Sequence, residues 1–150
     1  MRFDALLRQR KIFPHRATSD EIARLLALAE RDIRTARRVM AEDWDWAFSI
    51  AYNAVLQAAR AYMYSQGFRP AAAQGHKNTF AFMRIALGDK FASLVGYFDR
   101  MRMKRNQAIY DVAGSITEAE ARAIFGKAVE FVDIVRARVG PPGKKPARRR

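Results

Sequence analysis

A helix start and an apolar stripe follow one another in Thr18-Ser-Asp-Glu-Ile-Ala-Arg-Leu-Leu-Ala-Leu-Ala-Glu-Arg-Asp-Ile33. Thr18-Ser-Asp-Glu21 has the form of a capping box, in which the Thr18 hydroxyl accepts from an amide of the first turn and Glu21 reaches back. Apolar residues then recur at three- and four-residue steps as far as Met40, with arginines on the opposite face. This period predicts an amphipathic α-helix.

The rest of the chain repeats the helical pattern. We expect helices over about 45–66, 78–87 and 90–110, and a last helix that begins after a second capping box at Thr117-Glu-Ala-Glu120 and ends at Gly140-Pro-Pro142. Residues 68–75 are expected to be a connector, because Pro70 and Gly75 interrupt them. No stretch shows sustained strand alternation. The predicted fold is all-α, a four- to five-helix up-down bundle.

The composition fits one domain of 150 residues that can bury a core without disulfides. We expect an N-terminal arm over 1–17, the bundle over 18–139 and a disordered basic tail over 140–150. The chain has no cysteine and two histidines, so no metal site and no cofactor is expected. With neither a signal peptide nor a long apolar run in view, the expected location is the cytoplasm, away from membranes.

The formal net charge is +13 at pH 7. Such an excess favours polyanions, so we expect RNA or a nucleotide as the partner. A basic tail and an arginine-rich helix face could steer RNA toward a cleft, although a charged face opposite an apolar one is usually only solvated. A DNA-associated helical protein is a further reading of the same charge.

One polar cluster stands out near the end of the predicted helix over 90–110. Asn106 and Tyr110 are four residues apart and share a face with Arg102, while Arg105 lies beside them. A guanidinium, an amide and a phenol together could grip a phosphate and position a ribose or base. On spacing alone, a solvated basic face with a tyrosine at its end explains the pattern as well.

Four segments in this order resemble a HEPN domain, over about residues 18–139. They are Trp46-Ala-Phe-Ser-Ile-Ala-Tyr-Asn-Ala-Val-Leu-Gln-Ala-Ala-Arg-Ala-Tyr-Met63, Gly67-Phe-Arg-Pro70, Gly75-His-Lys77 and Arg105-Asn-Gln-Ala-Ile-Tyr-Asp111. The resemblance implies a helical bundle that commonly forms homodimers. It also implies a metal-independent RNase that acts as a toxin or in defence, often paired with a small nucleotidyltransferase as antitoxin.

The resemblance assigns roles to individual residues. Arg105 falls on the motif arginine of the family, Asn106 on the polar residue and Tyr110 on the position of the usual histidine. A histidine with a pKa of about 6.5 can exchange protons at neutral pH, whereas a tyrosine with a pKa near 10 stays protonated. The alternative is therefore a non-catalytic HEPN module that binds a nucleotide, RNA or the partner nucleotidyltransferase.

Two other groups are candidates for a role. His76 and Lys77 lie at the expected start of a short helix, where backbone amides favour anions, so both are weak binding candidates. A helix cap or ordinary packing is the simpler role for His76. The acidic run Glu42-Asp-Trp-Asp-Trp46 could bind a cation, but we expect Asp43 or Asp45 to cap the next helix instead.

Overall fold

The computed structural model describes residues 2–106 and 114–140. In chain order the elements are α1 (Asp4–Arg8), β1 (Ile12–Pro14), α2 (Ser19–Val39), α3 (Trp44–Ser65), β2 (Phe68–Pro70), α4 (Gly75–Leu87), a 3₁₀ turn η1 (Asp89–Phe91), α5 (Ala92–Asn106) and α6 (Glu118–Val139). The predicted all-α class is confirmed.

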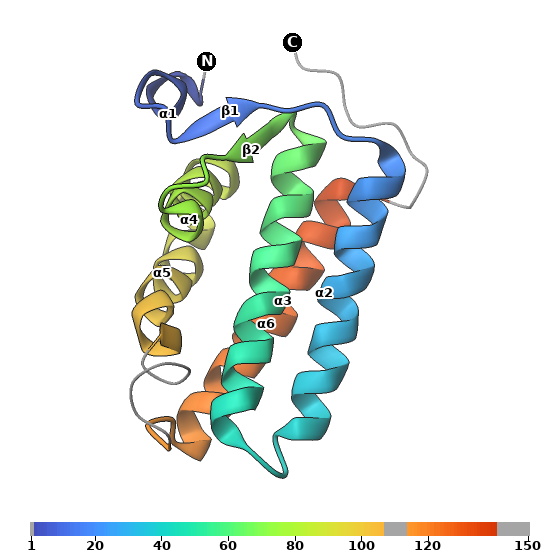
Figure 1. Cartoon of the computed structure of the whole chain (residues 1–150), viewed down its shortest axis with the longest axis vertical. Helices are drawn as coiled ribbons and strands as arrows, with labels where there is room; N and C mark the ends of the chain where they lie inside the picture. The colour runs from blue at the N-terminus through green and yellow to red at the C-terminus, as the bar shows by residue number, and fades with distance from the viewer. Residues whose placement is uncertain (1, 107–113, 141–150) are drawn as a thin grey trace.

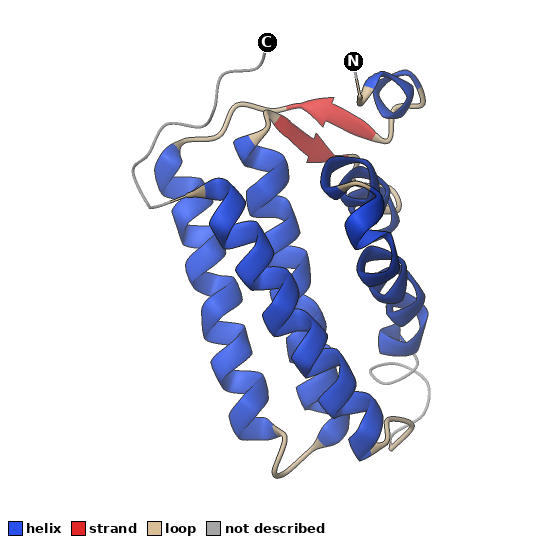
Figure 2. Ribbon diagram, turned by 180° about the vertical axis from the view of Figure 1, so that it is seen from behind, coloured by secondary structure: helices blue, strands red, loops and turns tan. Residues whose placement is uncertain are grey.

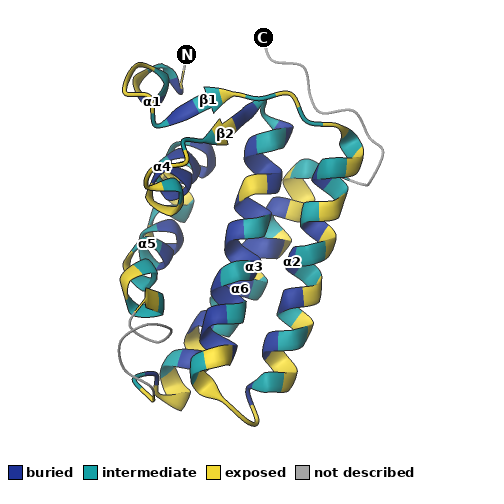
Figure 3. Cartoon of the chain, viewed as in Figure 1, coloured by how far each residue is buried: buried dark blue, intermediate teal, exposed yellow. Residues whose placement is uncertain are grey.

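Helix α3 is the centre of the bundle. It packs against α2 and α6 on one side and against α4 and α5 on the other, and the two views show α4 and α5 as a separate layer across α3 from α2 (Figures 1 and 2). Buried residues follow α3 along nearly its whole length (Figure 3). Its six buried alanines allow neighbouring backbones to approach closely: Ala47, Ala51, Ala54, Ala58, Ala59 and Ala61.

The two expected capping boxes differ in detail. At the start of α6 the box is complete, because the Thr117 hydroxyl accepts from the Glu120 amide and the Glu120 carboxylate accepts from the Thr117 amide. At the start of α2 the Thr18 hydroxyl accepts from the Glu21 amide at 3.1 Å, but the Glu21 carboxylate contacts that hydroxyl instead of the Thr18 amide. Only half of the box at Thr18 therefore forms.

A two-stranded antiparallel sheet closes one end of the bundle (Figure 1). It pairs Ile12 with Pro70 and Pro14 with Phe68, so part of the expected connector is a strand. Strands of three residues are too short to show alternation, which explains why the sequence did not indicate them. The first helix and strand join the core through Phe3, Leu6 and Ile12, all buried.

Helix α4 begins three residues before the expected position. Gln74 takes a left-handed conformation with φ 55°, and the Asn78 side-chain amide donates to the Ala73 carbonyl at 3.0 Å. The Thr79 hydroxyl donates to the Gly75 carbonyl at 2.7 Å. These local bonds fix the first turn of α4, which carries His76. The expected helix over 90–110 is described as α5 up to Asn106, and Tyr110 lies outside the described residues.

Candidate functional site

The last turn of α5 lies over the middle of α3. Arg105 is half-buried there, its Nη2 donates to Oδ1 of Asn53 at 3.4 Å, and its guanidinium carbon is 5.7 Å from the centre of the Tyr52 ring. Its Nε is buried and has no hydrogen-bond partner among the described residues. Because a buried N–H without an acceptor is costly, this Nε needs an acceptor from outside the described residues or from a ligand.

Tyr52 connects Arg105 to the first turn of α4. Its hydroxyl oxygen lies 3.4 Å from Nδ1 of His76. Burial raises the pKa of Tyr52 well above its usual range, although the nearby Arg105 and Arg102 charges oppose that shift. The phenol therefore keeps its proton throughout the physiological range and can act as a donor to an imidazole nitrogen.

His76 has the opposite shift. Partial removal from water lowers its pKa first, and the positive charges of Arg105, Arg102 and Arg60 lower it further. The imidazole is therefore neutral at pH 7. If Nδ1 accepts from the Tyr52 phenol, the proton is on Nε2 and the ring has no free acceptor; if Nδ1–H donates to the phenol oxygen, Nε2 is free to accept a proton. His76 is exposed, so it can exchange protons with solvent.

The structure separates the residues that the sequence suggested for this site. Arg105 and His76 both contact Tyr52. Arg102 is near enough to influence the pKa of both Tyr52 and His76, while its Nε pairs with Asp99 at 3.3 Å. Asn106 ends α5 and is exposed, as is Lys77. The amide that contacts Arg105 is that of Asn53, not that of Asn106.

Sequence reasoning missed Tyr52 and Asn53 as site residues. Tyr52 belongs to the apolar stripe of its helix, a pattern that predicts a core residue, and the structure shows it fully buried. The sequence offers one signal for them: Tyr52 and Asn53 are adjacent polar groups inside the uncharged stretch 46–59. Such a pair needs polar partners from elsewhere in the chain when it is buried. Which partners those are depends on α4 and α5, and the local pattern cannot show it.

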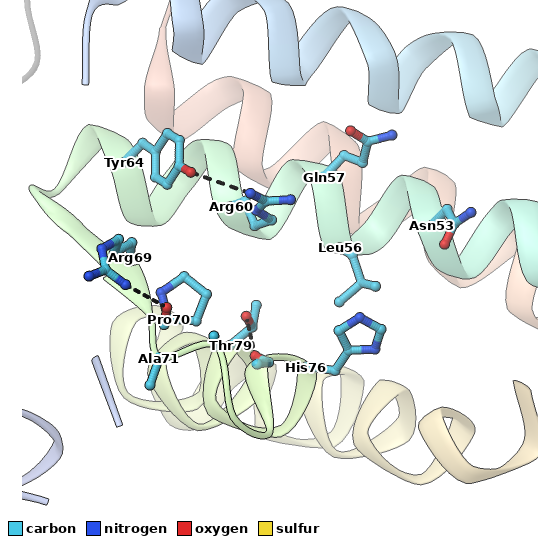
Figure 4. Close-up of a pocket in the computed structure, with 12 residues that line it drawn as sticks. Asn53, Leu56, Gln57, Arg60, Tyr64, Arg69, Pro70, Ala71, His76 and Thr79 are labelled. Carbon is cyan, nitrogen blue, oxygen red and sulfur yellow. Dashed lines mark hydrogen bonds between the residues drawn. The ribbon is translucent and has the colours of Figure 1, made fainter. Parts of the chain in front are cut away.

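A pocket of about 510 Å³ extends from this cluster toward the sheet. Its walls come from α3, β2 and the start of α4, and it shares Asn53 and His76 with the Arg105 cluster (Figure 4). Arg60 and Leu56 project from α3 across from Arg69 of β2 and His76 of α4. The volume is in the range of small-molecule sites.

The acidic run has structural roles. Asp43 caps α3, because its Oδ1 accepts from the Trp46 amide at 3.0 Å. Asp45 accepts from the Gly114 amide at 2.6 Å and the Ile116 amide at 3.1 Å, and so holds the chain just before α6. In the described part of the chain, no three histidine, cysteine, aspartate or glutamate side chains gather as a group that could hold a metal ion.

A family model described as HEPN domain matches residues 22–138. The match covers α2 to α6, including every contact described above around Arg105. None of the curated proteins matches the chain. Within the described ranges, no helix has the length and apolar character needed to cross a membrane.

Proposed function

We propose that the chain, which belongs to the HEPN domain family, is an RNA-acting protein that cleaves RNA without a metal ion, as the toxin-like half of a toxin–antitoxin or defence pair. Membership in the family points to a function with RNA or nucleotides. The finer function is supported by one observation: a half-buried guanidinium and a neutral imidazole meet on the same phenol, Tyr52.

The arrangement suits transfer of the phosphoryl group within RNA. Arg105 would bind a non-bridging oxygen of the scissile phosphate through its Nη and buried Nε groups. In the tautomer whose Nδ1–H donates to the Tyr52 oxygen, Nε2 of His76 would take the proton of the ribose 2′-hydroxyl, whose oxygen attacks phosphorus while the bond to the 5′-oxygen breaks. The products are a 2′,3′-cyclic phosphate and a 5′-hydroxyl, which receives a proton from an acid. No metal is required in this scheme.

Tyr110 and a second copy of the chain complete the proposal. Tyr110 stands at the motif position, and a phenol can donate a hydrogen bond or a proton to the leaving oxygen. A homodimer would place two Arg105 groups in one cleft, and Asn106, exposed at the end of α5, would face the bound RNA. The proposed antitoxin is a small nucleotidyltransferase, and the proposed location is the cytoplasm.

The test is cleavage of single-stranded RNA by the purified full chain in EDTA. We expect a cyclic phosphate product, loss of cleavage in Arg105→Ala, and little rescue in Arg105→Lys, because an ammonium cannot make the bidentate contact of a guanidinium. Lys104→Ala is the matched control. It removes the same charge from the adjacent position, where Lys104 pairs with Glu120 at 3.1 Å. Intact RNA from pH 6 to 9 at high protein concentration would refute the catalytic proposal.

A non-catalytic module is the second candidate. The contact between Tyr52 and His76 favours this candidate. Among the described residues His76 is the only histidine in the cluster, and the contact occupies one of its two nitrogens. In that case RNA, a nucleotide or the nucleotidyltransferase would bind without turnover. Affinity that falls in an Arg105→Ala variant, with no product in the wild type, would establish this alternative.

A further inference from the structure

We propose that the pocket between α3, β2 and α4 binds one nucleotide unit, with its phosphate between Arg60 and Arg69. The proposal extends the proposed RNA-acting function to a second subsite. It does not depend on cleavage, because it rests on Arg60 and Arg69, which are not the proposed catalytic groups. The nucleotide unit could belong to an RNA strand that continues to Arg105, or it could be a free nucleotide.

The charge of the pocket is the first observation that supports a phosphate site. Arg60 and Arg69 both line it, and both are exposed. Arg60 donates to the Tyr64 hydroxyl at 3.4 Å, and Arg69 donates to the Pro70 carbonyl at 3.4 Å. Neither has a carboxylate partner within 4.0 Å among the described residues, and no acidic side chain lines the pocket there. Two guanidinium groups without counter-ions at one hollow favour a phosphate.

The size and lining of the pocket are the second observation, and they fit the rest of a nucleotide. About 510 Å³ is room for a ribose and a base as well as a phosphate. Leu56, Pro70 and Ala71 supply apolar surface next to the two arginines, and Figure 4 shows Leu56 projecting into the space across from α4. A nucleotide has matching parts: a base whose flat faces pack on apolar surface, and a phosphate that carries the negative charge.

The start of α4 adds to the positive charge of the pocket. Its N-cap residue, Gln74, makes no side-chain capping bond, and Gly75 in the first turn lines the pocket. The first turn of a 13-residue helix carries a positive partial charge, which favours an anion near that end. At the other end, Asn53 and His76 belong both to the pocket and to the Arg105 cluster. A strand with one phosphate at Arg105 could therefore place a neighbouring unit here.

The experiment compares two charge-matched variants of the full chain. Arg60→Gln/Arg69→Gln removes the pocket cations, and Arg84→Gln/Arg122→Gln removes two exposed cations that pair with Asp89 and Glu118 elsewhere. Affinity is measured by fluorescence anisotropy with a single-stranded RNA oligomer and by calorimetry with AMP. Relative to the control, the pocket variant should raise the RNA Kd about tenfold or more and reduce the salt slope by roughly 1.4, the value for two lost contacts.

A third variant tests the pocket without changing charge. Ala72→Trp places a large side chain at an exposed lining position, and thermal melting should show that it folds. We expect the same loss of binding. RNA affinity that falls in both pocket variants while AMP does not bind identifies a strand subsite, and AMP affinity that falls in both identifies a free nucleotide. If the pocket variants bind both ligands as the control does, the proposal is wrong, whatever the outcome at Arg105.

These results stay separate from the test of cleavage. If the chain cleaves RNA, the pocket variants should raise KM more than they lower the rate at saturating RNA. The comparison is made at pH 8, where His76 stays neutral in every variant, because the loss of Arg60 removes one of the charges that lower the pKa of His76. If the chain does not cleave RNA, the binding results decide the pocket by themselves. A pocket variant that lost the saturating rate but kept its affinity would contradict the assignment of this pocket to binding.

Discussion

The hydroxyl of Tyr52 lies 3.4 Å from Nδ1 of His76, so a residue buried in the middle of α3 touches the first turn of α4. The same phenol ring lies 5.7 Å from the guanidinium carbon of Arg105 on α5. Three helices thus meet at one side chain. The helical bundle fixes the distance between a cation and a neutral imidazole that are 29 residues apart in the chain.

Stability should depend on pH through His76. Its pKa in the folded state is lowered, so below about pH 6.5 the unfolded chain binds the proton more readily than the folded one. Stability from this group is therefore present at neutral pH and is lost as the pH falls. We expect the melting temperature of His76→Gln to decline less than that of the wild type between pH 7.5 and 5.5. Parallel curves for the two proteins would contradict the assignment.

Tyr52 should act on the reaction by positioning His76. In the tautomer that leaves Nε2 free, Nδ1–H donates to the Tyr52 oxygen, and this bond favours the imidazolium, so Tyr52→Phe should lower the pKa of His76 further. If the chain cleaves RNA, the acidic limb of the pH–rate profile should then move to lower pH, with a rate loss of roughly tenfold at neutral pH because the ring is no longer held in that tautomer. Tyr62→Phe, also on α3 and buried, is the control. A purely structural role for Tyr52 would lower the rate without moving the profile.

The sequence predicted the helices of this bundle because their signals are local. Thr117 and Glu120 form the expected box, and Gly140 follows the last residue of α6. The site depends on contacts between distant segments, so only its ends could be proposed: Arg105 from a family motif and His76 from a helix start. Tyr52 and Asn53 look like ordinary members of a buried helix until α4 and α5 are in place. Tyr110 lies outside the described residues, so its role stays a prediction.

A buried polar link between α2 and α3 offers a test of stability. Asp32 is 7% exposed, and its Oδ2 accepts from Nε2 of Gln57 at 3.0 Å. Gln57→Leu leaves a buried carboxylate oxygen without this donor, which should cost about 1–3 kcal/mol in urea unfolding. Asp32→Leu/Gln57→Leu removes both partners and should cost less than the sum of the single changes.

The exposed partner of Asp32 supplies the control for that cycle. Arg31 Nη2 lies 3.0 Å from Oδ1 of Asp32, but the arginine side chain is largely in water. Arg31→Gln should therefore cost about 1 kcal/mol or less. Strict additivity of the two leucine substitutions would show that Asp32 and Gln57 do not stabilise the contact between α2 and α3 together.

Asp45 should contribute more to stability than the cap residue two positions before it. Its carboxylate accepts from two backbone amides, Gly114 and Ile116, which lie about seventy residues further along the chain. Asp45→Ala leaves both amides without this acceptor, and we expect a loss of about 2–4 kcal/mol because bonds to a charged group are the stronger ones. Asp45→Asn keeps one acceptor oxygen and should recover part of that loss.

Asp43→Ala is the comparison for Asp45. It removes the N-cap bond to the Trp46 amide and should cost about 1 kcal/mol. The losses differ because Asp43 stabilises one helix end, whereas Asp45 ties the start of α3 to the segment that leads into α6. Urea midpoints of the three variants decide the order. Equal losses for Asp43→Ala and Asp45→Ala would mean that the amides of Gly114 and Ile116 find water at no cost, and that α6 is held in place by its apolar face alone.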